Sequence, residues 1–97
     1  MQTFVMLTRL APDAVKSPRA LEDLERKAVE AVKAKCPRSS GRTAVMGPYD
    51  DIDILEAPDL ANAAQVSAQV RAFGHAHTEI WGAMEWARFK EAVRALA

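Results

Sequence analysis

The sequence is short of the residues that mark several protein classes. It holds one cysteine among 97 residues, which excludes an internal disulfide framework and favours a reducing compartment. No apolar run approaches the roughly 20 residues of a membrane-spanning helix, and the start of the chain lacks the basic and apolar regions of a signal peptide. The 13 Lys and Arg residues balance the 13 Asp and Glu residues, whereas a general nucleic-acid binder needs a basic excess. We therefore expect a cytoplasmic protein with neither nucleic-acid nor membrane partners.

Motifs of common catalytic and cofactor sites are also missing. The chain has no Gly-rich phosphate loop, no Cys-x-x-Cys pair and no zinc-finger spacing. Its one cysteine, Cys36, directly precedes Pro37 at the expected end of a helix, where the helix dipole raises the pKa of a thiol. We expect neither a cysteine nucleophile nor a bound cofactor.

What the sequence does contain is typical of one globular domain over residues 1–97, with 49% hydrophobic and 27% charged residues. Thr3–Leu10 is short, apolar and rich in β-favouring residues, which predicts a strand. Ser17–Pro18 supplies a helix N-cap and a proline at the first helical position. The helix that follows is predicted to end at Cys36–Pro37, and its apolar stripe is Leu21, Leu24, Ala28, Ala31 and Val32.

The second half of the chain continues the alternation of strands and helices. The runs Thr43–Met46 and Asp51–Ala57 flank a cluster of turn-forming residues and predict a hairpin. A second helix is expected from Pro58–Asp59 to a C-terminal cap at Gly74. His75–Gly82 then predicts a fourth strand, and Glu85–Leu96 a terminal helix with a large apolar edge.

The predicted order is β-α-β-β-α-β with a C-terminal helix, an α+β chain of the ferredoxin-like type. Both central helices then cover one face of a four-stranded antiparallel sheet. A chain of this length buries only about 60–65% of its unfolded surface, so we expect the open face to pair with a second copy. Charge is uneven in a way that suits self-association: the segment 43–70 has five acidic residues and no Lys or Arg.

The stretch Gly47–Asp59, GPYDDIDILEAPD, has a Gly-x-Tyr-Asp turn that runs into a strand ending in Glu-Ala-Pro-Asp. It resembles the signature of the GYD domain family. Phe4–Thr8 and the pair Thr78–Glu79 resemble the first and last strands of that family, so the resemblance spans nearly the whole chain. It implies a ferredoxin-like fold that forms dimeric α+β barrels. Related small families include monooxygenases, isomerases, stress-responsive proteins and ligand-sensing modules, but the resemblance implies no particular activity.

The run from His75 to Glu79 holds the candidate metal-binding and proton-transfer residues. Alternate residues of a strand share a face, so we expect His75, His77 and Glu79 to project together, with Trp81 next. Two imidazoles and a carboxylate there could bind a divalent metal such as zinc, or His77 could act as a base. The alternative is a solvated or interface surface without chemistry. Relatives tend to have a basic residue where this chain has His77, so a role of the histidines is particular to this sequence.

The acidic candidates lie in the turn and the strand that follows it. Asp51 and Asp53 share a strand face, and if this is the open face, Asp53 would orient and charge His77. Tyr49 could close a pocket with its ring and bind a ligand through its hydroxyl. Turn formation alone also explains an Asp at position 50.

Two further charged residues need a partner. Arg9, at the end of the first strand, could bind an anionic ligand or pair with Glu79, although a surface salt bridge of little energetic weight is the commoner role. Glu56 shares the parity of Ile52 and Ile54 and needs a partner if it is buried. An Arg or Lys of another subunit could be the partner of Glu56.

These residues support three hypotheses. The first, which we favour, is a homodimeric or larger homo-oligomeric module that binds or senses a small molecule on its open sheet face. The second is a cofactor-independent dimeric-barrel enzyme, of isomerase or monooxygenase type, with His77 as base and Asp53 as its orienter. The third is a structural or metal-binding oligomer. The candidate ligand-binding residues are Tyr49, Arg9, His75, Glu79 and Trp81, and the candidate metal ligands are His75, His77 and Glu79.

Overall fold

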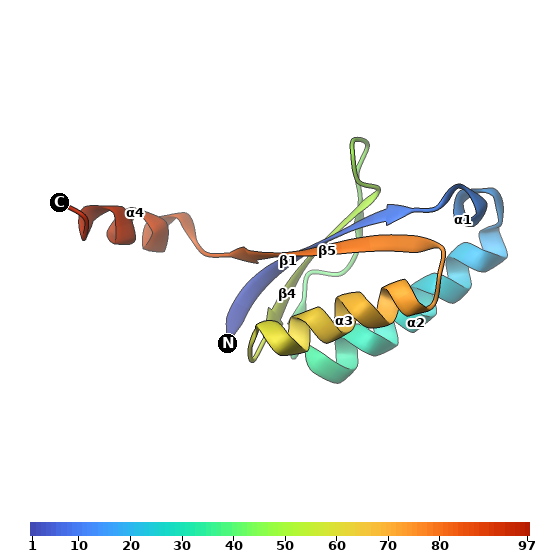
Figure 1. Cartoon of the computed structure of the whole chain (residues 1–97), viewed down its shortest axis with the longest axis horizontal. Helices are drawn as coiled ribbons and strands as arrows, with labels where there is room; N and C mark the ends of the chain where they lie inside the picture. The colour runs from blue at the N-terminus through green and yellow to red at the C-terminus, as the bar shows by residue number, and fades with distance from the viewer.

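The computed structural model describes residues 1–97 as one antiparallel sheet with helices on one of its faces. The elements are β1 (Gln2–Leu10), α1 (Pro12–Lys16), α2 (Pro18–Lys35), β2 (Arg38–Ser39), β3 (Thr43–Ala44), β4 (Asp51–Ala57), α3 (Leu60–Ala72), β5 (Ala76–Ala83) and α4 (Trp86–Arg94). The strand order is β2-β4-β1-β5, and β3 also pairs with β4. Figure 1 shows α2 and α3 side by side against the sheet, while α4 projects beyond the end of β5. None of these helices has the length and apolar character needed to cross a membrane.

β1 is a central strand, and its pairing with β4 and β5 determines which side chains lie on the helix-covered face and which on the open face. It pairs with β4 from Gln2 opposite Ala57 to Thr8 opposite Asp51. On its other edge it pairs with β5, where Arg9 lies opposite His77. Since side chains alternate along a strand, one set of β1 residues meets the helices and the other set lies on the open face. The same alternation along β5 brings His77, Glu79 and Trp81 to the open face and Thr78 to the helices.

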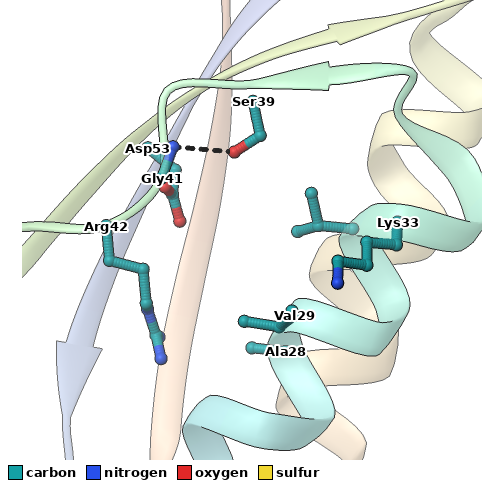
Figure 2. Close-up of a pocket in the computed structure, with 8 residues that line it drawn as sticks. Ala28, Val29, Lys33, Ser39, Gly41, Arg42 and Asp53 are labelled. Carbon is teal, nitrogen blue, oxygen red and sulfur yellow. Dashed lines mark hydrogen bonds between the residues drawn. The ribbon is translucent and has the colours of Figure 1, made fainter.

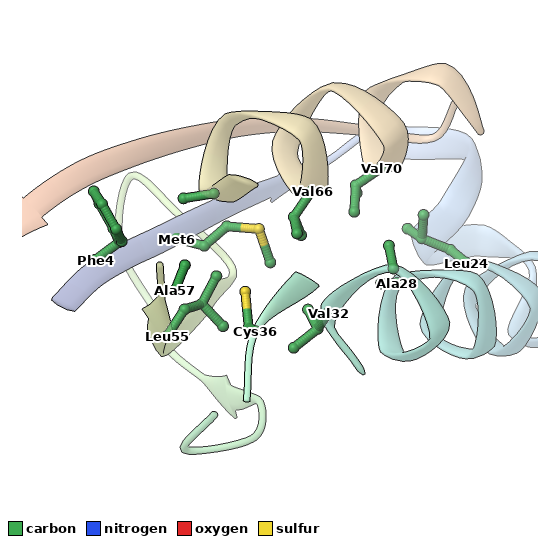
Figure 3. Packing of buried hydrophobic residues seen from close by; sticks show 12 residues of the cluster. Phe4, Met6, Leu24, Ala28, Val32, Cys36, Leu55, Ala57, Val66 and Val70 are labelled. Carbon is green, nitrogen blue, oxygen red and sulfur yellow. The ribbon is translucent and has the colours of Figure 1, made fainter. Parts of the chain in front are cut away.

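The core lies between the sheet and the helix pair α2–α3. It is a cluster of 12 buried residues, several of which Figure 3 labels. Met6, Leu55, Val66 and Val70 are fully buried. Cys36 belongs to the same cluster, and its burial raises the pKa of the thiol. A buried thiol of raised pKa is a poor nucleophile, and Cys36 contributes to the packing of the core.

The helix starts predicted from capping residues are confirmed. The Ser17 hydroxyl accepts a hydrogen bond from the backbone N–H of Ala20 at 3.2 Å, directly before α2. Asp59 does the same for α3, with 2.9 Å between its Oδ1 and the backbone nitrogen of Asn62. These bonds satisfy backbone donors that have no partner within the helix. α3 ends just before Gly74, whose φ of +79° is the left-handed conformation that glycine adopts easily.

The strand predicted over Thr43–Met46 is only partly present, and the sheet has five strands where four were expected. Only Thr43 and Ala44 pair with β4, and Arg38 and Ser39 pair with it separately. Gly41 lies between the two pieces with a φ of +76°, which bends the chain away from the sheet. The Ser40 hydroxyl bridges the gap by accepting a bond from the Ile54 backbone N–H at 2.9 Å.

Three other boundaries differ from those predicted. The short helix α1 forms at Pro12–Lys16, between the predicted strand and the predicted helix, where no element was expected. His75 was placed in the last strand, but it has a φ of +70° and β5 begins one residue later. The terminal helix covers Trp86–Arg94 and contains no buried residue.

A buried hydroxyl pair joins β5 to α3 and gives a stability prediction. The Thr78 hydroxyl donates to the Ser67 carbonyl at 3.1 Å and also contacts the Ser67 hydroxyl. Thr78→Val keeps the shape but leaves the Ser67 groups without this partner, so we expect a loss of about 1–3 kcal/mol in the free energy of unfolding. Chemical denaturation measures the loss. Thr43→Val, at an exposed position of β3, is the control and should change stability by less than about 0.5 kcal/mol.

Candidate functional site

The open face carries a cluster built around the carboxylate of Glu79. The Tyr49 hydroxyl donates a hydrogen bond to Glu79 Oε2 at 2.7 Å. The Trp81 indole N–H donates to Glu79 Oε1 at 3.2 Å. The two rings meet edge to face, with 6.2 Å between their centroids and an angle of 88° between their planes. Both carboxylate oxygens therefore have a donor, and the two aromatic rings form a wall beside them.

These hydrogen bonds hold Glu79 in its ionised form. The bond from Tyr49, followed by the bond from Trp81, lowers the pKa of the Glu79 carboxyl group. The same bond to Glu79 raises the pKa of the Tyr49 hydroxyl. At neutral pH the site therefore contains a carboxylate and a neutral phenol, since a donor stabilises the charged acceptor.

Two basic side chains flank the aromatic wall. The Arg9 guanidinium lies over the Tyr49 ring, with 5.8 Å from Cζ to the ring centroid, which is within the range of a cation–π contact. His77 is the cross-strand neighbour of Arg9, and its Nε2 lies 3.7 Å from Glu79 Oε2. The open face thus brings together Arg9, Tyr49, His77, Glu79 and Trp81, all of which were candidates from the sequence.

Asp50 fixes the turn that presents Tyr49. Its carboxylate Oδ2 accepts a hydrogen bond from the Leu10 backbone N–H at 2.8 Å. Its own backbone N–H donates to the Thr8 carbonyl at 2.8 Å. These bonds extend the contact between β1 and the start of β4, and so they hold Tyr49 over the neighbouring strand. Nothing in the structure explains a glycine at position 47, where an added Cβ would meet open space.

The expected pair of Asp53 and His77 does not form, which is a correction to the sequence interpretation. Asp53 shares the parity of Leu55 and Ala57, which are fully buried against the helices. It therefore lies on the opposite face of the sheet from His77. An orienting role for Asp53 toward this histidine has no support in the geometry, and the acid near His77 is Glu79.

His75 is also separate from the cluster. Because it precedes β5 in a left-handed conformation, it does not share the face of His77 and Glu79. Its Nδ1 lies 2.7 Å from the Asp13 carboxylate of α1, and its carbonyl accepts a bond from the Ala11 backbone N–H. No group of three His, Cys, Asp or Glu side chains is gathered for a metal ion, so the three-residue metal set is not assembled.

The partner expected for Glu56 in another subunit is found within the chain. Its Oε2 lies 3.5 Å from Nε of Arg38, on the neighbouring strand β2. The Arg38 side chain is 81% exposed and that of Glu56 is 37% exposed, so this ion pair contributes little to stability. The sequence interpretation missed it because β2 itself was not expected.

A concave feature lies on the helix side of the sheet, between α2 and the segment that follows it (Figure 2). It is a cavity of about 210 Å³. Its lining residues are Ala28, Val29, Val32, Lys33, Ser39, Gly41, Arg42 and Asp53. Asp53 is 3% exposed, and this burial, with the nearby Asp51 charge adding to it and Arg42 opposing it, raises the pKa of the Asp53 carboxyl group to about 6. The sequence analysis considered Asp53 only as a partner of His77 and gave no sign of this cavity.

Comparison with known proteins identifies the family. The model of the GYD domain matches residues 4–93. The chain belongs to the GYD domain family. No curated protein matches this GYD domain.

Two solved structures share its fold. One is TTHA0845 from Thermus thermophilus, which is 22% identical, with a TM-score of 0.62 over 88% of this GYD domain and 95% of that chain. The other is 5-chloro-2-hydroxyhydroquinone dehydrochlorinase (TftG) from Burkholderia phenoliruptrix AC1100, in complex with 2,5-dihydroxybenzoquinone. It is 14% identical, with a TM-score of 0.59 over 89% of this GYD domain and 97% of that chain. At these identities the likeness establishes an α+β fold with an antiparallel sheet, and the function has to be argued from the site.

Proposed function

We propose that the protein is a homodimeric module that binds a small planar molecule with an acidic oxygen on the open sheet face. The observation that carries the proposal is the pairing of two basic groups with an aromatic wall. Arg9 and His77 stand next to each other across two strands, and the rings of Tyr49 and Trp81 meet beside them. A planar anion can stack on the rings while the basic groups contact its oxygen.

Arg9 is available for such a ligand. The ion pairs of the chain involve Arg26, Arg38 and Arg42, and none involves Arg9. The one carboxylate of the cluster already accepts bonds from Tyr49 and Trp81. These donors reduce the repulsion that Glu79 would exert on an anion, and the guanidinium keeps its planar donor edge for the ligand.

Exposed apolar groups support the homodimer. Ile54 is 48% exposed and Trp81 50% exposed on a sheet face that no helix covers. Along α4 the apolar residues Trp86, Phe89 and Val93 form an exposed stripe. A helix of nine residues is marginal alone in water, so it needs a surface to pack against. Two ferredoxin-like subunits with facing sheets, in a dimeric α+β barrel, would cover both surfaces and enclose the site.

The binding proposal is tested with 4-hydroxybenzoate and with 4-hydroxybenzamide, its uncharged analogue of similar shape. We expect 4-hydroxybenzoate to shift the NMR signal of the Trp81 indole N–H in a saturable way, and the amide to bind at least tenfold more weakly. Arg9→Gln should weaken 4-hydroxybenzoate binding by tenfold or more. Arg38→Gln, a matched change on the exposed strand β2, should leave it unchanged. Equal binding of the two compounds, or unchanged binding by Arg9→Gln, contradicts the proposal.

A second candidate, a cofactor-independent enzyme with His77 as base, is favoured by the histidine–carboxylate pair. His77 Nε2 is 3.7 Å from Glu79 Oε2, and a nearby carboxylate stabilises the imidazolium that forms when a histidine takes a proton. One protein of the same fold is a dehydrochlorinase of a chlorinated hydroxyhydroquinone. Loss of HCl from such a compound needs a base to remove a proton.

Chloride release from 5-chloro-2-hydroxyhydroquinone tests this second candidate. If His77 acts as a base, the protein releases chloride above the spontaneous rate, and His77→Gln lowers the rate by roughly 10²–10⁴-fold. His75→Gln is the matched control, because this histidine contacts Asp13 and lies apart from the site. A wild-type rate equal to the spontaneous rate rejects this reaction, and the binding proposal remains separately measurable with 4-hydroxybenzoate.

A further inference from the structure

The cavity between α2 and the segment Ser39–Arg42 combines an apolar wall with one buried carboxylate. Figure 2 shows Ala28, Val29 and Lys33 on α2 and Arg42 on the opposite side of the opening. Val32 adds a further apolar group to the α2 wall. The volume of about 210 Å³ is several times the roughly 30 Å³ that one water molecule takes up in the liquid. The space is therefore large enough for a small organic molecule.

The carboxylate in this cavity is Asp53, and one of its oxygens has no partner. Asp53 Oδ1 is fully buried and accepts no hydrogen bond. Buried polar atoms without a partner are uncommon, because each one costs the free energy of its lost hydration. The side chain is 3% exposed and is part of the cavity lining. An acceptor in this position calls for a donor that enters the cavity.

The neighbouring charges leave Asp53 without a dedicated counter-ion. Arg42 lies 3.3 Å from the Asp51 carboxylate, measured from Nε to Oδ2, and forms its ion pair there. Lys33, on the rim of the cavity, has no ion pair with Asp53 and an exposed side chain. With one arginine shared between two acids, the pair Asp51–Asp53 retains a net negative charge when both carboxyl groups are ionised.

We propose that this cavity is a second binding site, for a small organic cation with an N–H donor head and an apolar body. The donor head would satisfy Asp53 Oδ1 and supply the missing positive charge. The apolar body would lie against the Ala and Val side chains of α2. This site is on the helix side of the sheet, so it is independent of the ligand proposed for the open face.

Binding of n-butylammonium, compared with n-butanol, tests the site directly. We expect n-butylammonium chloride to shift the methyl signals of Val29 and Val32 in a saturable way at millimolar concentrations, and sodium chloride at equal ionic strength to shift neither. n-Butanol has the same chain without the charge and should bind at least tenfold more weakly. Equal binding of the alcohol, or no saturable shift with the amine, overturns the proposal.

Two variants with matched controls locate the binding. Asp53→Asn keeps the shape of the side chain and removes its charge, so n-butylammonium affinity should fall at least tenfold. Asp23→Asn, on the exposed side of α2, should leave the affinity unchanged. Val29→Phe, at the partly exposed mouth of the cavity, should block binding, whereas Val15→Phe on α1 should not. Affinity retained within twofold in Asp53→Asn or Val29→Phe overturns the proposal.

The pH dependence gives an independent readout. The amine stays protonated between pH 5 and 7.5, as lysine does, and Asp53 becomes protonated as the pH falls through about 6. The charged groups near it are Asp51, Arg42 and Lys33. Because only about a tenth of Asp53 is ionised at pH 5, n-butylammonium affinity should be about tenfold lower there than at pH 7.5. An affinity that stays constant over this range overturns the proposal.

Discussion

Replacing Ile54 with Lys is expected to convert the proposed dimer into a monomer. Ile54 lies in β4 on the open face and is 48% exposed in the single chain. In a symmetric dimer the same surface of each subunit forms the interface, so one substitution places two lysines in it. Burying unpaired ammonium groups costs several kcal/mol, and about 4 kcal/mol corresponds to a thousandfold weaker dimer. Sedimentation over a range of concentrations measures the change in dissociation constant.

The control for this prediction is Leu60→Lys. Leu60 is 58% exposed, but it lies at the start of α3, on the face that the helices cover. This variant should sediment as the wild-type protein does. A wild-type chain that remains monomeric at high micromolar concentration contradicts the dimer, and so does an Ile54→Lys variant that remains dimeric.

Removing residues 84–97 tests where α4 packs. None of the residues of α4 is buried within its own chain, and its apolar stripe is exposed. If α4 packs on the partner, the shortened chain forms a weaker dimer. If α4 instead folds back onto its own subunit, the shortened chain is less stable and dimerises as before. The two outcomes separate in sedimentation and thermal denaturation.

Local signals in the sequence predicted most of the fold. Ser17 and Asp59 mark helix starts because their side-chain oxygens accept bonds from free backbone N–H groups, and both bonds are present. The bounds of β4 agree with those expected, Asp51–Ala57. The short edge strands β2 and β3, which pair with β4, were less predictable. Gly41 interrupts the edge strand, and a two-residue strand has too little periodicity to stand out.

The orientation of β4 shows where alternation alone is not enough. Its sequence DIDILEA has apolar residues on both faces: Ile52 and Ile54 on one, Leu55 and Ala57 on the other. Polarity alone favours the isoleucines in the core, yet the structure buries Leu55 and Ala57 and with them Asp51 and Asp53. The isoleucines that remain on the open face support a partner there, and the buried carboxylates are the cost of that arrangement.

The open-face cluster could be predicted residue by residue but not as a set of contacts. Tyr49 and Glu79 are 30 positions apart, and their hydrogen bond depends on the turn that Asp50 holds against β1. His77 and Arg9 are neighbours only because β1 and β5 pair in one particular register. His75 was misplaced because its left-handed conformation removes it from the alternation of the strand. Register and backbone conformation of this kind are decided by tertiary packing.

Asp53→Asn is expected to stabilise the protein at neutral pH, by about 1–3 kcal/mol in the free energy of unfolding. The pKa of Asp53 is about 6 in the folded chain against an ordinary value of 3.8, and each pKa unit corresponds to about 1.4 kcal/mol. Because the folded pKa is the higher one, protonation favours the folded state. The stability from this group is present below about pH 4 and is lost as the pH rises through about 6. The amide removes the charge but keeps a polar group, so the gain is smaller than the full shift implies.

Urea denaturation at a fixed protein concentration, repeated from pH 4 to pH 7, measures this difference. Concentration is held constant because the stability of a dimer depends on it. The variant should exceed the wild type by a margin that grows between pH 4 and 6 and is constant above that. Asp59→Asn gives the opposite sign as a control, since the bond from the Asn62 backbone lowers the pKa of Asp59. A margin that does not change with pH contradicts a buried, uncompensated Asp53. A gain at pH 7 together with lost n-butylammonium binding, the two results expected for Asp53→Asn, marks Asp53 as a residue kept for binding at the expense of stability.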